Sequence, residues 1–215
     1  TAAPVLASDA RLVINGEERP LSPYELAMGQ AEVRLPESAE ELQLRWQGIK
    51  TDILFGGVTY RVAEKASEAT ATGQKLKVTK EVYARRIVSD RPELVRLSDV
   101  QAARQGEKLL VRYFVETEQD LSLVTISDTR IAGAEPGYDF SGYGVSDRLF
   151  WCYTRRESTD HIYIDYLPRG KHVLELEAVA NVRGHYSYGP AQIRSIYAPE
   201  YAGNSAGGTV EIKQK

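Results

Sequence analysis

Strict alternation of apolar and polar residues is the feature that most constrains the fold of this chain. Two such runs, at 161–166 and 171–180, flank Leu167-Pro168-Arg169-Gly170, where proline presets one turn dihedral and glycine permits a positive φ. This pattern predicts a β-hairpin. A second pair of runs, at 191–197 and 209–213, is joined by a segment rich in Pro, Gly, Asn and Ser. No helical periodicity interrupts these runs, so the end of the chain is predicted to be sheet.

The part of the chain before these runs, residues 76–127, also shows short apolar runs that predict strands. Strands are predicted at 76–86, 93–97, 109–116 and 121–127, at a spacing of about ten residues with polar turn residues between several of them. Such regular spacing is typical of a β-sandwich. We therefore predict one antiparallel β-sandwich domain over residues 76–215.

The start of the chain predicts a smaller β-domain. Arg11–Ile14 is a short apolar run followed by Asn15-Gly16, the commonest pair in tight hairpin turns. Further strands are predicted at 31–35, 41–46 and 55–62. A domain of about 60 residues lies near the lower limit for a core that stands alone.

The predicted fold class is all-β, with two consecutive β-sandwich-like domains. Residues 1–68 form the first and residues 76–215 the second, an antiparallel sandwich. Residues 69–75 are predicted to be a linker, because their threonine and glycine content disfavours a helix.

Composition and charge exclude several classes of partner. The net charge is -3 with both signs interspersed, so no basic surface for nucleic acid is predicted. No apolar run approaches the ~20 residues of a membrane span, and no direct insertion into a membrane is predicted. The chain begins at Thr1 without the basic and apolar parts of a signal peptide, which favours a mature product or a piece of a longer protein.

Candidate catalytic and metal-binding residues are few. Cys152 is the only cysteine, and its aromatic neighbours are typical of a small buried hydrophobe. His161, His172 and His185 are too far apart in sequence to form a local metal motif. We predict no catalytic residue, no metal site and no cofactor, so the chain is not expected to be an enzyme.

Two local patterns imitate catalytic sites. The segment 184–189 resembles a nucleophile elbow but has one residue too many before its serine. Glu175 and Glu177 stand two residues apart, so a strand would place both on one solvated face. A hydrolase would also need His185 within hydrogen-bond distance of Ser187 or another hydroxyl, with a carboxylate behind it.

Tyrosine is the residue type that points to a binding surface. Seven of the thirteen tyrosines lie in or near the predicted loops of the second domain: Tyr138, Tyr143, Tyr153, Tyr186, Tyr188, Tyr197 and Tyr201. Tyrosine is favoured where a surface is both apolar and hydrogen-bonding, but it is also common in strands, and both interpretations stay open. Tyr138 and Tyr143, in the long segment 131–144, are candidate residues of a binding surface.

Three groups of short motifs follow one another in the second domain. They are Ile126–Arg130 with Ala132–Pro136, then Ile164–Gly170 with Val173–Glu175, and finally Ile196–Glu200 with Ser205–Gly208. With these motifs, residues 76–213 resemble the C-terminal macroglobulin-like domain of bacterial alpha-2-macroglobulins. More weakly, Glu41–Lys65 is similar to the end of the small β-domain that follows the thioester domain in this family.

The resemblance implies a non-catalytic tail of a longer protein of the bacterial periplasm or cell envelope. Such proteins entrap proteases: a bait segment is cleaved, the chain rearranges, and an internal Cys-Gln thioester can acylate the protease. The thioester motif is not in this sequence, because Tyr153 follows Cys152. The implied partners are the other domains of the parent chain and, for the whole parent, proteases.

By position in the last motif, Ile196 and Tyr197 match the family residues that pack over the thioester. An acyl bond of this kind survives only while it is shielded from water. Plain interdomain packing is an equal alternative for these two residues. A second function class also fits the sequence: a surface adhesion or glycan-binding sandwich that uses the tyrosines of the 133–144 segment.

Overall fold

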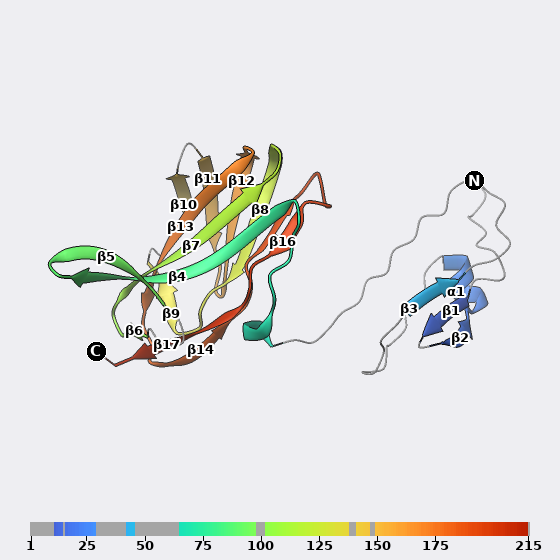
Figure 1. Cartoon of the computed structure of the whole chain (residues 1–215), viewed down its shortest axis with the longest axis horizontal. Coiled ribbons are helices and arrows are strands. Elements are labelled where there is room, and N and C mark those ends of the chain that lie inside the picture. Colours follow the sequence, from blue (N-terminus) through green and yellow to red (C-terminus); the bar gives the residue numbers. More distant parts are fainter. Residues whose placement is uncertain are drawn as a thin grey trace. The chain divides into compact units, whose positions relative to one another are not determined.

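The computed structural model describes residues 11–14, 16–28, 42–45, 65–97, 102–137, 141–146 and 149–214. The chain divides into two compact units, residues 1–60 and 61–215 (Figure 1). Nearly all of the described secondary structure is strand, which confirms the all-β fold class. No helix in the described ranges is long and apolar enough to cross a membrane.

The first unit holds a three-stranded antiparallel sheet with the order β2-β1-β3. Its strands are β1 (Arg11–Ile14), β2 (Glu17–Pro20) and β3 (Leu42–Arg45). Gly16, with a φ of 84°, lies between β1 and β2, so a hairpin connection is present where the sequence predicts one. The strands predicted at 31–35 and 55–62 lie outside the described residues.

A short helix, α1 (Pro23–Met28), follows β2 and was not predicted. Its signal is a capping box: the amide of Glu25 donates to Ser22 Oγ at 3.2 Å, and the amide of Ser22 donates to Glu25 Oε2 at 2.8 Å. Proline at the first helical position fits this start, because a first-turn amide has no partner inside a helix. Arg19 then binds both oxygens of the Glu25 carboxylate.

The Glu25 carboxylate is expected to titrate far below the usual range of glutamate. The hydrogen bonds from Arg19 and then from the Ser22 amide lower its pKa to about 2. Because the folded pKa is depressed, the stabilisation from ionised Glu25 is complete above the unfolded value, ~4.3, and is lost as pH falls toward 2. NMR titration of the side-chain carboxyl measures this directly. A pKa close to 4 would contradict the capping geometry, and Arg19→Gln should move the pKa upward.

The second unit contains three sheets. The six-stranded sheet has the order β10-β11-β12-β8-β15-β16 and the five-stranded sheet the order β5-β4-β7-β13-β9. The first consists of β8 (Leu121–Thr129), β10 (Gly142–Ser146), β11 (Leu149–Arg155), β12 (Thr159–Leu167), β15 (Gln192–Ser195) and β16 (Ala202–Asn204). The second consists of β4 (Leu76–Val88), β5 (Arg91–Arg96), β7 (Lys108–Thr117), β9 (Ala134–Pro136) and β13 (Gly170–Ala180).

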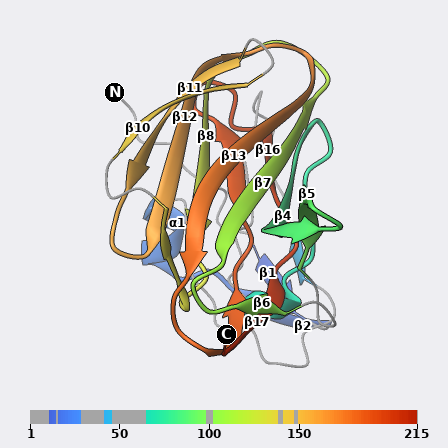
Figure 2. The same cartoon turned by 90° about the vertical axis from the view of Figure 1, so that its left-hand side faces the viewer.

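The two large sheets pack face to face as a sandwich (Figure 2). Alternation along each strand sends every second side chain into the space between them. Tyr113 and Val115 of β7 and Ile162 and Ile164 of β12 are almost completely buried in this core. The antiparallel sandwich predicted from the sequence is therefore confirmed.

A small third sheet closes one end of the sandwich. It has the order β14-β17-β6 and consists of β6 (Ala103–Arg104), β14 (Gly184–Tyr188) and β17 (Gly208–Lys213). Val210 and Ile212 of β17 bury their side chains against Val82 of β4 and Leu109 of β7 in a second apolar cluster. The long strands β4 and β7 thus contribute to both cores.

The predicted hairpin around residues 167–170 is wrong, although both of its runs are strands. β12 pairs with β8 and β11, whereas β13 pairs with β7 and β9, so the connection at Pro168 and Arg169 crosses from one sheet to the other. Proline and glycine permit this crossing as well as a hairpin turn. The crossing is favoured because it lets both strands bury apolar side chains, among them Leu167 and Leu174, in one core.

Two other sequence assignments also change. The runs at 191–197 and 209–213 do not pair with each other, since β15 ends at Ser195 and joins the six-stranded sheet, while β17 joins the small third sheet. The segment 131–144, predicted as one long loop, contains β9 and the start of β10. Short edge strands of this kind carry little apolar alternation, so their sequence is hard to tell from a loop.

Residues 69–75, which the sequence assigns to a linker, belong to the second unit and hydrogen-bond with its C-terminal segment. The amides of Thr72 and Asn204 donate to each other's carbonyl oxygens at 2.9 and 3.1 Å, and Gly207 N donates to Ala69 O at 2.9 Å. A 3-10 helix, η1 (Ala66–Glu68), precedes this segment. The domain bounds drawn from the sequence, 1–68 and 76–215, stay a prediction.

Candidate functional site

The β12–β13 and β15–β16 connections, which carry parts of the second and third motif groups, lie at one end of the sandwich together with the β7–β8 turn, whereas the first group, Ile126–Arg130 with Ala132–Pro136, lies toward the other end of β8. The β7–β8, β12–β13 and β15–β16 connections are joined there by hydrogen bonds. Asp120, between β7 and β8, accepts from the Tyr166 hydroxyl at 2.8 Å and from the Arg169 amide at 2.7 Å. The Arg169 amide and then the Tyr166 hydroxyl lower the pKa of Asp120. An ionised Asp120 therefore holds the β12–β13 crossing against the β7–β8 turn.

The third connection is fixed to the same end through β8. Ile196 N donates to Leu123 O at 2.9 Å, and Ser195 Oγ donates to Ser122 O at 3.3 Å. Within the connection, Ala198 N donates to Ser195 Oγ at 3.3 Å. Tyr201 N donates to Ala198 O at 2.9 Å, and its ring is buried in the core. The backbone on both sides of Tyr197 is thus held in one conformation.

Ile196 and Tyr197 themselves face solvent. Ile196 is 52% exposed and Tyr197 is 74% exposed, although both are large apolar side chains. Tyr166, which the sequence analysis did not single out, is 54% exposed at the same end of the sandwich. We call these three side chains the apical patch. Their position in a rigid, hydrogen-bonded end is typical of a contact surface rather than of a core.

The sequence signal for Tyr166 was available. It lies inside the Ile164–Gly170 motif, although it has the parity of the buried Ile162 and Ile164, so alternation alone predicts an inward side chain. The sequence could not predict which residues surround Tyr166. It lies opposite Ser122 in the sheet and donates to Asp120, and both contacts exist only in the folded chain.

The other candidate residues are not brought to the apical patch. Tyr143 lies on β10 at one edge of the six-stranded sheet, and β11, β12 and β8 separate it from β15. It is 75% exposed and its ring stacks on Phe150 with the centroids 5.4 Å apart. Tyr138 lies outside the described residues.

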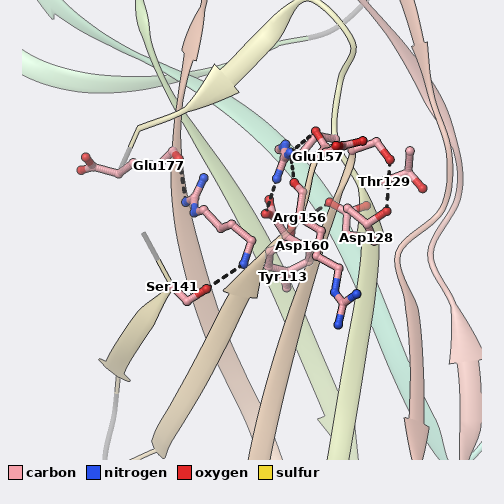
Figure 3. A network of polar contacts seen from close by, with 12 residues as sticks. Tyr113, Asp128, Thr129, Ser141, Arg156, Glu157, Asp160 and Glu177 are labelled. Carbon is pink, nitrogen blue, oxygen red and sulfur yellow. Dashed lines mark hydrogen bonds and ion pairs between the residues drawn. The ribbon is translucent and has the colours of Figure 1, made fainter. Parts of the chain in front are cut away.

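A buried polar network lies between the two large sheets (Figure 3). Lys80 Nζ of β4 is 2.6 Å from Asp128 Oδ1 of β8, and the Tyr113 hydroxyl donates to Asp128 Oδ2 at 2.7 Å. Asp160 of β12 lies directly opposite Asp128 and is bound by Arg130 at 2.6 Å. Burial raises the pKa of Asp128, and the neighbouring Lys80 opposes this shift.

The network has the character of a structural element. Each of its two carboxylates has a cation beside it, as buried charges require. Arg130 also donates to the carbonyl oxygens of Arg156 and Glu157, which ties β8 to the β11–β12 turn. No sequence motif indicates this network, because its members come from four different strands, β4, β7, β8 and β12.

The histidines and the cysteine show no shared site. Across the described ranges, no group of three or more His, Cys, Asp or Glu side chains could hold a metal ion. His161 contacts Ser127 Oγ at 3.0 Å, His172 contacts the Pro168 carbonyl at 2.7 Å, and His185 contacts Glu211 at 3.3 Å. Cys152 is half-buried on β11.

Glu175 and Glu177 of β13 are held by arginines. Arg112 contacts Glu175 at 2.6 Å, and Arg85 contacts Glu177 at 3.5 Å. Both carboxylates therefore lie on the outer face of the five-stranded sheet, as their period-two spacing predicts.

One protein-family model matches most of this chain. The model of the bacterial alpha-2-macroglobulin MG10 domain matches residues 69–200, which is more than half of the sequence. This match confirms the resemblance carried by the motifs of the second domain. The comparison with curated proteins found no match.

Solved structures of alpha-2-macroglobulins share the fold. Salmonella alpha-2-macroglobulin reacted with methylamine is 17% identical, with a TM-score of 0.51 over 69% of this chain and 10% of that chain. Trypsin-activated alpha-2-macroglobulin from Escherichia coli is 13% identical, with a TM-score of 0.51 over 67% of this chain and 11% of that one. The E. coli protein activated by porcine elastase is 14% identical, with a TM-score of 0.52 over 67% of this chain and 14% of that one. The chain thus spans about a tenth of the length of the first relatives.

Proposed function

Because the chain belongs to the bacterial alpha-2-macroglobulin family, we propose that it is a non-catalytic part of a protease inhibitor whose apical patch docks on another domain of the parent protein. The observation that carries this proposal is the exposure of Ile196 and Tyr197 on a connection whose backbone is fixed by hydrogen bonds. A rigid apolar tip loses little conformational entropy when it is covered, which favours docking.

We further propose that the surface covered by Tyr197 is the thioester domain of the parent. In this arrangement the tyrosine ring keeps water and small amines from the acyl bond, which is the physical role that the family position implies. The implied location is the bacterial periplasm or cell envelope. Methylamine, with which the Salmonella relative was reacted, is a suitable small nucleophile for a test of this proposal.

Tyr197→Ala in the full-length parent is the decisive substitution. Truncating a buried aromatic contact commonly costs about 2 kcal/mol or more, so we expect methylamine to release the thioester thiol about tenfold faster or more. The measurement is the rate of thiol release in methylamine. Val182→Ala is the matched control, because Val182 is 53% exposed in the β13–β14 connection, at the other end of β13, and should leave the rate unchanged.

A second readout separates docking from shielding. Hydrogen exchange of residues 192–204 should be about tenfold slower in the parent than in the 215-residue chain if the patch is covered. Equal exchange in both proteins would overturn the docking proposal. Slow exchange with an unchanged rate of thiol release would keep the docking and assign Tyr197 to plain interdomain packing.

The alternative of a glycan-binding module rests on Tyr143, the most exposed aromatic side chain on the six-stranded sheet. One face of its ring is covered by Phe150, which leaves the other face for a sugar. Saturable glycan binding that is lost in Tyr143→Ala and kept in Tyr197→Ala would favour this alternative over the inhibitor.

A further inference from the structure

Two strand edges of the sandwich have no partner strand among the described residues. β10 is the last strand of the six-stranded sheet and pairs only with β11. β13 pairs along its whole length with β7 on one side, but on the other side β9 covers only Ala178 to Ala180. Residues 171–177 of β13 therefore present an open edge.

A groove of about 620 Å³ lies between these two edges. Residues 143–146 of β10 line one side, and Val173, Glu175 and Glu177 of β13 line the other. Contacts limit it at both ends: Ser146 Oγ donates to Val173 O, and Arg155 Nη2 donates to Glu177 O at 3.1 Å. Figure 3 labels Glu177 and Ser141, the two residues that Arg155 contacts near this end.

The backbone of Glu175 is the free part of this edge. In a strand, alternate residues direct their amide and carbonyl to the same side. Glu177 O accepts from Gly137 N at 2.9 Å, so Glu175 and Val173 also direct these groups toward the groove. Val173 O is occupied by Ser146, whereas the amide and carbonyl of Glu175 form no hydrogen bond with any described residue.

The charges around the groove leave one cation without a carboxylate. Arg112 is paired with Glu175 and Arg85 with Glu177. Arg155 lies within ion-pair distance of no described carboxylate, and its Nε is buried without an acceptor. A bound molecule that brings acidic oxygen atoms would complete this set.

We propose that the groove binds a short extended peptide that carries a carboxylate. The peptide adds to the edge of β13, where its backbone pairs with the amide and carbonyl of Glu175, and its acidic side chain meets Arg155. Main-chain pairing supplies the affinity in such strand addition, and the side chain supplies selectivity. This site is distinct from the apical patch and does not depend on it.

The test uses the 215-residue chain and a fluorescein-labelled peptide, Val-Thr-Val-Asp-Val-Thr. Fluorescence polarisation should show saturable binding. Replacing the aspartate of the peptide by lysine should weaken binding about tenfold, because a charge-assisted hydrogen bond becomes a repulsion. Replacing the two residues beside the aspartate by proline should weaken it by a similar factor, because proline removes the backbone donors.

Variants of the chain locate the site. Arg155→Gln should abolish the preference for aspartate over lysine, while Arg194→Gln, at an exposed position of β15, should leave it intact. The peptide comparisons use the unaltered chain, so they decide the proposal even if Arg155→Gln fails to fold. Equal binding of the three peptides, or none, would overturn it. Dimerisation of the chain in analytical ultracentrifugation, with peptide binding that falls as the chain dimerises, would also overturn it and assign the groove to a second copy.

Discussion

Replacing Lys80 by alanine is expected to lower the free energy of unfolding by about 3–5 kcal/mol at pH 7. Lys80 and Asp128 are both buried between the sheets, with Nζ and Oδ1 2.6 Å apart. Removing the lysine leaves the Asp128 carboxylate in a low-dielectric core without its cation. An unpaired charge in the core costs more free energy than the few packing contacts that a lysine-to-alanine substitution removes at an exposed position.

The loss of stability in Lys80→Ala should become larger as pH rises. Burial already raises the pKa of Asp128, and without Lys80 it must rise further, since Lys80 opposes the shift. The folded variant then binds a proton that the unfolded chain releases near pH 4. The contribution of Asp128 to the stability of the variant is therefore most favourable below the unfolded pKa and is lost as pH rises through the folded pKa.

Urea denaturation followed by tryptophan fluorescence measures both effects, since Trp151 lies in the same core. Lys77→Ala is the matched control, because Lys77 lies on the same strand but is exposed. Lys80→Met combined with Asp128→Asn should recover part of the loss, as it removes both charges and keeps an acceptor for Tyr113. A loss no larger than that of Lys77→Ala would show that the pair contributes nothing.

The second large effect on stability distinguishes Tyr201 from Tyr197, two tyrosines of the β15–β16 connection. Tyr201 is 7% exposed and packs in the main core, whereas Tyr197 is 74% exposed. Tyr201→Ala is expected to lower the free energy of unfolding by about 3–5 kcal/mol through the lost burial and the cavity that remains. Tyr197→Ala should change it by no more than about 0.5 kcal/mol.

The same urea experiment checks this contrast, with both variants measured beside the unaltered chain. If Tyr197→Ala destabilised the chain as much as Tyr201→Ala, the exposed tyrosine would have a packing role, and the docking proposal would lose its main support. If Tyr201→Ala had no effect, the position of this connection on the core would be wrong. The expected outcome leaves Tyr197→Ala as a clean probe of docking.

Part of the candidate site could be predicted from sequence. Ile196 and Tyr197 were found from a short motif, and the structure places them exposed on a fixed connection. Tyr166 was missed because nothing local distinguishes an outward tyrosine on a strand from one that lies beside a site. Its relation to Asp120, 46 positions away in sequence, exists only in the folded chain.

The sequence by itself determined several long strands of the second unit, among them β4, β7, β8, β12 and β13, because period-two alternation is a local property of the chain. It also determined the family, through motifs that need no fold to be read. Which strands pair was decided only by the tertiary structure. A turn such as Pro168 to Gly170 serves a hairpin and a crossing between sheets equally well, and the burial of both strands in one shared core selects the crossing.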